Sequence, residues 1–137
     1  MTSGLYLLDT NTISYSVRGN YPQVRARISG MIADQLAISA ITEAELRFWV
    51  ASRPEEARVR IIVDNLLSQI TSLPWNSALT STYAQLKASC RQSGIALSEL
   101  DLLIAAHALA LDATLVTHDR AFRHIPGLRT EDWVQIA

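Results

Sequence analysis

The feature that most constrains the fold is a series of short apolar runs, each ending in polar residues. Residues 5–8 form the first run and lead directly into Asp9. A continuous apolar run of this length is typical of a strand that is buried on both faces, as in a parallel sheet. Similar runs predict three more strands and a fifth strand at an edge of the sheet. These ranges are 36–39, 70–73, 113–117 and, at the edge, 133–136.

Helical patterns alternate with these runs. Pro22 suits the first turn of a helix, and Gly94 marks the end of a later one. The spacing of apolar residues predicts helices over 22–32, 41–50, 54–67, 76–91 and 98–110. Strands that alternate with helices predict an α/β sandwich with a mostly parallel sheet. The length of 137 residues predicts a single domain over residues 1–137.

Composition limits the function classes. Hydrophobic residues make up 49% and charged residues 18%, against a usual charged share of about 25%, so disorder is excluded. With a net charge of −1, the chain lacks the excess of basic residues that is typical of nucleic-acid-binding proteins. The single cysteine, Cys90, excludes an intramolecular disulfide. It favours a cytoplasmic protein, and no segment resembles a signal peptide or a membrane span.

Two acidic residues follow predicted strands. Asp9 comes directly after the first strand, and Asp119 follows the strand over 113–117 by one residue. In open α/β sheets, ligands bind beyond the carboxyl ends of the strands, so both acids are candidate site residues. Either could instead cap a helix or form an Asx-turn.

Two further acids lie in predicted helices, Glu45 three residues after Thr42 and Asp101 three residues after Ser98. This spacing fits a capping box. Glu45, however, has aromatic residues at i+3 and i+4, whereas Glu43 has an arginine at i+4. Glu45 is therefore predicted to face inward and Glu43 outward. The helix of Asp101 is apolar almost all round, and a buried carboxylate is costly without a cation.

A divalent metal shared by Asp9, Glu45, Asp101 and Asp119 accounts for all four acids together. Carboxylate oxygens select hard cations, so Mg²⁺ is expected and Mn²⁺ is an alternative. The sequence has no cysteine pair and no paired-histidine spacing of the kind that zinc sites use. Such a site can activate water and neutralise charge on a phosphate.

The motifs resemble the PIN-domain family and, within it, the VapC-type toxins. The segments that carry the resemblance are LLDTN (7–11), ISAITEAEL (38–46), DLLIAAHAL (101–109), LVTHD (115–119), Phe122 and IPGL (125–128). They cover nearly the whole chain in the family's order. The resemblance implies a three-layer α/β/α fold and a Mg²⁺-dependent endoribonuclease that hydrolyses RNA phosphodiester bonds with metal-activated water. It also implies a cognate VapB-type antitoxin, a homodimer and a toxin–antitoxin hetero-oligomer.

The resemblance also implies roles for individual residues. Asp9 and Asp101 match the family's direct metal ligands, while Glu45 and Asp119 would bind a second ion or orient water. Asn11 and Thr117 would hold the ligands in place by hydrogen bonds. The fourth position departs from many relatives, because His118 and Asp119 stand where those have Arg and Asn.

Several other side chains have more than one interpretation. His118 is interpreted as a helix cap in preference to a substrate contact, and His107 as a packed helix residue. Four arginines are either phosphate contacts or ordinary surface residues, namely Arg18, Arg120, Arg123 and Arg129. The aromatic residues Phe48, Trp49 and Trp75 belong to the core, to a dimer interface or to an antitoxin groove.

Three other functions compete with that of a metal-dependent nuclease. A receiver domain needs a lysine at the end of a late strand, but Lys87, the only lysine, falls inside a predicted helix. A phosphatase with an aspartate nucleophile needs a second Asp two residues after the first, and position 11 is Asn. The remaining alternative is a catalytically silent PIN-fold module that sequesters RNA or antitoxin.

Overall fold

A five-stranded parallel sheet forms the centre of the computed structural model, which describes residues 4–135. The strands are β1 (Tyr6–Leu8), β2 (Leu36–Ser39), β3 (Thr71–Leu73), β4 (Thr114–Val116) and β5 (Arg129–Glu131). Their order in the sheet is β3-β2-β1-β4-β5, and each neighbouring pair is parallel. The central position of β1 follows from its register, because Leu7 pairs with Ala37 on one side and with Leu115 on the other.

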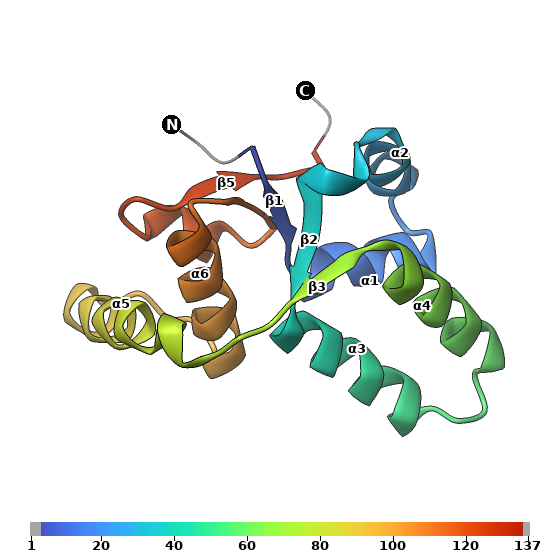
Figure 1. Cartoon of the computed structure of the whole chain (residues 1–137), viewed down its shortest axis with the longest axis horizontal. Coiled ribbons are helices and arrows are strands. Elements are labelled where there is room, and N and C mark those ends of the chain that lie inside the picture. The colour runs from blue at the N-terminus through green and yellow to red at the C-terminus, as the bar shows by residue number, and fades with distance from the viewer. Residues whose placement is uncertain (1–3, 136–137) are drawn as a thin grey trace.

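Helices cover both faces of the sheet, as Figure 1 shows. The helices α1 (Thr10–Arg18), α2 (Pro22–Gly30), α3 (Ala40–Ser52) and α4 (Ala57–Gln69) lie on one face, and α5 (Thr80–Ser93) and α6 (Glu99–Leu111) on the other. Three short 3₁₀ helices complete the described chain: η1 (Ala33–Gln35), η2 (Ser77–Leu79) and η3 (Arg120–His124). The predicted three-layer α/β/α architecture is confirmed, with a sheet that is parallel throughout.

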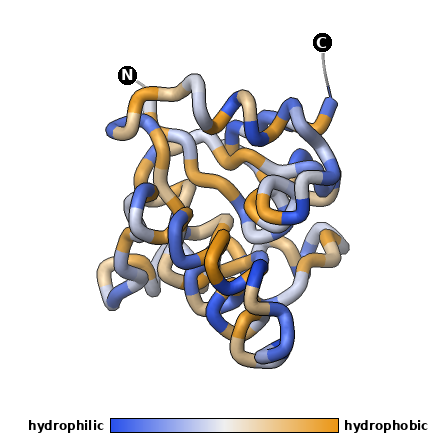
Figure 2. Tube along the Cα trace, turned by 90° about the vertical axis from the view of Figure 1, so that its right-hand side faces the viewer, coloured by the Kyte–Doolittle hydropathy of each residue, from blue (hydrophilic) through white to orange (hydrophobic). Residues whose placement is uncertain are grey.

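Alternate residues of each central strand pack into different cores. Leu7 of β1 packs with α5 and α6, whereas Leu8 packs with the helices of the other face, and both side chains are fully buried. Leu115 and Val116 of β4 divide in the same way. Because both faces are covered, these strands are apolar without interruption. Hydrophobic and hydrophilic residues alternate over short distances along the trace in Figure 2, as expected for helices that each turn one side to the sheet.

The fifth strand differs from its predicted position. It is formed by Arg129–Glu131, which pairs with β4, and residues 133–135 of the predicted range 133–136 are not in a strand. Trp133 is only 4% exposed and packs against Tyr6 with ring centroids 5.7 Å apart, so this apolar residue closes the core after the strand has ended. Residue 136 of the predicted range lies outside the described residues.

Helix α1 is not predicted by the apolar pattern, and α4 begins later than expected. Asp9 caps α1, whose buried face includes Thr12 and Ser16 beside two aliphatic residues. Because half of that face is hydroxylic, the sequence shows no apolar helical pattern there. The first helical residue of α4 is Ala57, not Pro54. Among residues 4–135, no helix is long and apolar enough to cross a membrane.

Candidate active site

The candidate acids gather at the edge of the sheet where the parallel strands end. Asp9 follows β1 directly, and Asp119 follows β4. Glu45 lies in the second turn of α3, which begins immediately after β2, and Asp101 lies in the first turn of α6. This edge is the position at which open α/β sheets bind ligands. The fold therefore brings all four predicted acids to one edge of the sheet.

Asp9 is a buried carboxylate that is held by its own helix. Its side chain is 4% exposed, and its Oδ1 accepts a hydrogen bond of 2.8 Å from the backbone N–H of Thr12. The side chain of Thr117 also hydrogen-bonds it, whereas the hydroxyl of Thr12 donates to the backbone carbonyl of Val116 at 3.2 Å. Burial nevertheless raises the pKa of the Asp9 carboxyl above its ordinary value, and the charge of Asp101 adds to this effect. The site thus makes ionised Asp9 costly in the absence of a cation.

Asp101 is positioned by the cap of α6. The hydroxyl of Ser98 accepts a 3.1 Å hydrogen bond from the backbone N–H of Asp101, as the sequence predicts for a helix that begins here. Burial raises the pKa of the Asp101 carboxyl, a hydrogen bond with Ser98 lowers it, and the charge of Asp119 raises it. Electrostatic repulsion therefore links Asp9 to Asp101 and Asp101 to Asp119.

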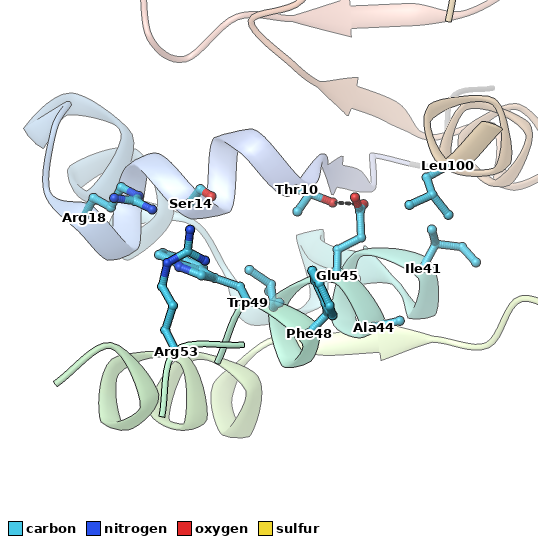
Figure 3. A pocket seen from close by; sticks show the side chains of 11 residues that line it. Thr10, Ser14, Arg18, Ile41, Ala44, Glu45, Phe48, Trp49, Arg53 and Leu100 are labelled. Atoms are coloured by element: carbon cyan, nitrogen blue, oxygen red, sulfur yellow. Dashed lines mark hydrogen bonds between the residues drawn. The ribbon is translucent and has the colours of Figure 1, made fainter. Parts of the chain in front are cut away.

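Glu45 points toward α1, where the hydroxyl of Thr10 donates a 2.6 Å hydrogen bond to its Oε1 (Figure 3). The same hydroxyl lies 3.1 Å from Oγ1 of Thr42. Glu43, by contrast, pairs with Arg47 at 2.7 Å. Glu45 thus faces inward as predicted, but Glu43 is only partly outward, because its side chain is 28% exposed and also hydrogen-bonds Ser72.

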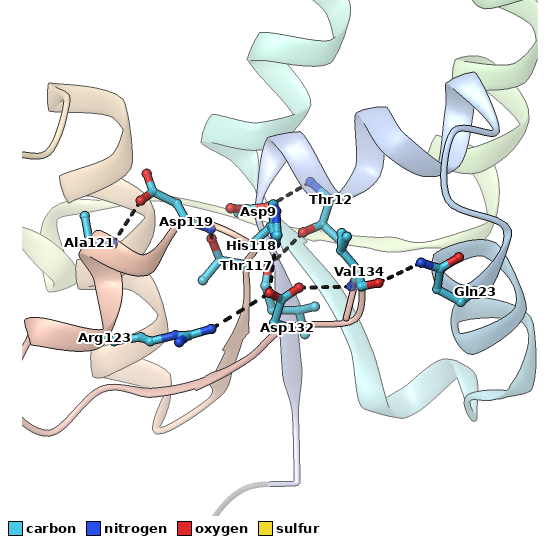
Figure 4. Close-up of polar contacts among 11 residues, drawn as sticks. Asp9, Thr12, Gln23, Thr117, His118, Asp119, Ala121, Arg123, Asp132 and Val134 are labelled. Carbon is cyan, nitrogen blue, oxygen red and sulfur yellow. Dashed lines mark hydrogen bonds and ion pairs between the residues drawn. The ribbon is translucent and has the colours of Figure 1, made fainter. Parts of the chain in front are cut away.

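Asp119 starts the short helix η3, and its Oδ1 accepts a 2.9 Å hydrogen bond from the backbone N–H of Ala121 (Figure 4). Its own backbone N–H donates to Oγ1 of Thr117 at 3.1 Å. Thr117 is buried and hydrogen-bonds both Asp9 and Asp119, so it ties together the ends of β1 and β4. Asn11, which is predicted to hold a ligand in place, is exposed in the first turn of α1, and it is the backbone N–H of Thr12 that hydrogen-bonds Asp9.

The four acids lack the usual compensation for grouped carboxylates. Within residues 4–135 none of them forms a salt bridge with an arginine, lysine or histidine. No three acidic, histidine or cysteine side chains in that range are close enough to form a metal cage by themselves. Mg²⁺ usually takes only one or two carboxylates and completes its shell with water and substrate phosphates. The Asp9 and Asp101 oxygens therefore fit a hard divalent cation.

A fifth acid at this edge, Asp132, is not among the residues predicted from the sequence. It follows β5 directly, and its side chain is 8% exposed. Its Oδ2 lies 2.8 Å from Nδ1 of His118 and 3.8 Å from the guanidinium of Arg123 (Figure 4). The prediction that His118 caps a helix is wrong, because Asp119 caps η3 and His118 turns to this carboxylate. An acid directly after a strand is the signal that could have found it, but the apolar pattern places the fifth strand after Asp132 and not before it.

Other candidate side chains separate into different roles. His107 is 2% exposed and hydrogen-bonds Ser39 at 2.8 Å, which confirms it as a packed helix residue. Arg129 binds Asp112 at 2.8 Å, at the end of the sheet where β4 and β5 begin, so it lies far from the acids. The thiol of Cys90 is 3% exposed and burial raises its pKa, an environment that is typical of packed cysteines.

Comparisons with known proteins agree with this fold. A family model described as PIN domain matches residues 6–128. Ribonuclease VapC2 of Rickettsia felis is 33% identical over 132 residues, which cover 94% of this chain and 98% of that protein. The tRNA(fMet)-specific endonuclease VapC of Shigella flexneri is 28% identical over 129 residues, which cover 93% and 97%.

Solved structures give the same result. The structure of VapBC2 from Rickettsia felis bound to a promoter DNA fragment matches with a TM-score of 0.86 and 31% identity, over 94% of this chain and 98% of that one. The structure of DNA-bound VapBC from Salmonella typhimurium matches with a TM-score of 0.86 and 28% identity, over 97% and 99%.

Proposed function

The chain belongs to the PIN-domain family, and from that premise we propose that it is the toxin of a toxin–antitoxin pair and a divalent-cation-dependent endoribonuclease. The observation that carries the proposal is the set of acids at the carboxyl edge of the sheet, where buried Asp9 and half-buried Asp101 repel each other without a cationic partner in the described chain. The relatives named as ribonucleases support an RNA substrate.

Asp9 and Asp101 would hold Mg²⁺, or Mn²⁺ in its place, and Glu45 and Asp119 would bind a second ion or orient water. When bound, the cation supplies Lewis-acid activation of water and neutralises charge on the phosphate. The donor set is entirely oxygen, which suits these hard cations.

The remaining side chains of the site act by positioning. Thr12 and Thr117 fix the carboxylate of Asp9, and the hydroxyl of Thr10 fixes Glu45 at 2.6 Å. Ser98 fixes the first turn of α6 and so the direction of Asp101. Such hydrogen bonds to acidic ligands hold their orientation and tune their basicity. No serine or cysteine nucleophile is needed in this scheme, because water is the attacking group.

We also propose that the chain assembles with a VapB-type antitoxin and forms a homodimer within a toxin–antitoxin hetero-oligomer. The support is that the solved structures it resembles are described as VapBC complexes from Rickettsia felis and Salmonella typhimurium.

The test is cleavage of total RNA by the purified chain, free of antitoxin, first with Mg²⁺ and then with EDTA. We expect fragments with Mg²⁺ and intact RNA with EDTA. Asp9→Asn and Asp101→Asn should lower the rate at least about a hundredfold, by analogy with the loss of one transition-state-stabilising group. Asp64→Asn, an exposed acid on α4, is the matched control and should cleave normally. Metal-independent RNA binding without cleavage would instead support the silent binding module.

A further inference from the structure

A cavity of about 530 Å³ lies between α1, α3 and the first turn of α6. Its size is within the range of about 300–1,000 Å³ that small ligands occupy. Glu45 and Thr10 line one end of the cavity, and Arg18 and Arg53 line the other (Figure 3). The cavity is therefore continuous with the candidate active site, because Glu45 belongs to both.

The wall of the cavity carries an aromatic side chain that the fold does not bury. Phe48 lies one turn after Glu45 on α3 and is 73% exposed. Leu100, at the start of α6, lines the same cavity and is 43% exposed. Two of the four large exposed hydrophobic residues in the described chain thus meet at this cavity. Exposed apolar groups gathered beside a catalytic acid indicate a binding surface.

The far end of the cavity is cationic. The guanidinium of Arg18 lies 4.7 Å from the ring centroid of Trp49, which holds it on this wall. Across residues 4–135, neither Arg18 nor Arg53 has an acidic partner. This end of the cavity therefore offers hydrogen-bond donors and positive charge to an anionic occupant.

Basic side chains continue beyond this cavity. Arg18 also lines a neighbouring cavity of about 720 Å³, between α1, α2 and α4, and Arg25 and Arg58 line it as well. Starting from Glu45, the surface thus presents an aromatic ring, then a pair of arginines, then two more arginines. This order matches a single-stranded nucleic acid, which combines stackable bases with regularly spaced phosphates.

We propose that the cavity between α1 and α3 binds the RNA nucleotide next to the scissile bond, with its base stacked on Phe48 and its phosphate on Arg18 and Arg53. The proposal rests on the ribonuclease function proposed above and adds the path by which the strand leaves the acidic edge. It makes Phe48, Arg18 and Arg53 substrate-binding residues that affect affinity and not the chemical step.

The test measures binding of a fluorescein-labelled single-stranded RNA oligonucleotide to the full chain by fluorescence anisotropy in EDTA, over a range of NaCl concentrations. Phe48→Ala should raise Kd about tenfold, through lost base stacking. The double variant Arg18→Gln/Arg53→Gln should reduce the slope of log Kd against log salt by about 0.7, because both arginines bind one phosphate and each phosphate neutralised on a single strand contributes about 0.7. Unchanged thermal unfolding shows that each variant is folded.

The matched controls are Ile32→Ala, which is 66% exposed before the start of β2, and Arg91→Gln on α5. Both should bind RNA as the wild type does. The proposal is overturned if the cavity variants bind RNA with wild-type affinity and salt slope. It is also overturned if they lose only the binding of antitoxin, which would assign the cavity to a protein partner. Since EDTA prevents metal-dependent cleavage, this result is independent of the cleavage assay that tests the ribonuclease function.

Discussion

At Asp9, helix capping and site chemistry coincide in one side chain. Its carboxylate accepts a hydrogen bond from the backbone N–H of Thr12 at the start of α1, and the residue follows the end of β1. Asp119 likewise caps η3 through the backbone N–H of Ala121. The helix-cap and acidic-site interpretations of the sequence are therefore compatible. Capping fixes the direction of each carboxylate and leaves its negative charge without a cation.

Replacement of Asp101 should stabilise the protein while it abolishes activity. Asp101→Asn removes a charge that acts on both Asp9 and Asp119, so in EDTA the Tm should rise by about 2–4 °C. Mg²⁺ should raise the Tm of the wild type more than that of the variant, because only the wild type has the complete ligand pair. Thermal unfolding monitored by circular dichroism measures both. A variant less stable than the wild type in EDTA would show that repulsion among these acids does not destabilise the fold.

His107 should make stability depend on pH. Burial lowers its pKa below the ordinary 6.5, so the folded protein keeps the ring neutral while the unfolded chain takes up a proton near pH 6.5. This contribution to the free energy of unfolding is complete above pH 6.5 and is lost as the pH falls below it.

Urea denaturation between pH 5 and pH 8 measures this effect in the wild type and in His107→Asn. The variant is expected to be less stable at every pH, because it loses packing and the contact with Ser39. Its free energy of unfolding should also fall less steeply below pH 6.5. Equal pH slopes in the two proteins would show that His107 is not the group responsible.

At the scale of elements, four strands and most helices are predictable because burial leaves a plain pattern. The strand after Leu5 alternates between two apolar cores, and α6 begins at the predicted cap Ser98. Helix α1 is not predictable, because Thr12 and Ser16 fill its buried face and the cap of Asp9 organises it. Asp132 is not predictable as a site residue for a related reason. The strand before it, β5, is held by pairing with β4, and its partly buried residues form no apolar run.

The cap of α6 should influence both stability and catalysis. Ser98→Ala removes the acceptor for the N–H of Asp101 and should lower the free energy of unfolding by about 1 kcal/mol. Because the same turn carries Asp101, kcat should fall as well. Asn76→Ala, which removes the cap of η2 on a helix without site residues, should cost stability and leave kcat unchanged. Equal kcat for wild type and Ser98→Ala would show that the cap of α6 does not position Asp101 for catalysis.

At the scale of the whole molecule, acidic and basic side chains lie in different regions, although the net charge is only −1. Acids gather where the strands end, while Arg18, Arg53, Arg25 and Arg58 line the two cavities beside α1. A net charge averages these regions, which is why composition alone disfavours a nucleic-acid substrate. Under the proposed function, a divalent cation compensates the acidic edge, and the arginines meet the RNA strand further along.

Asp9 and Asp101 should together hold a divalent cation, and a titration with Mn²⁺ tests this central claim most directly. Electron paramagnetic resonance of free Mn²⁺ reports how much the chain binds, without RNA or antitoxin. We expect saturable binding by the wild type and by Asp64→Asn, and at least about tenfold weaker binding by Asp9→Asn and Asp101→Asn. Equal Mn²⁺ affinity in all four proteins would contradict the claim.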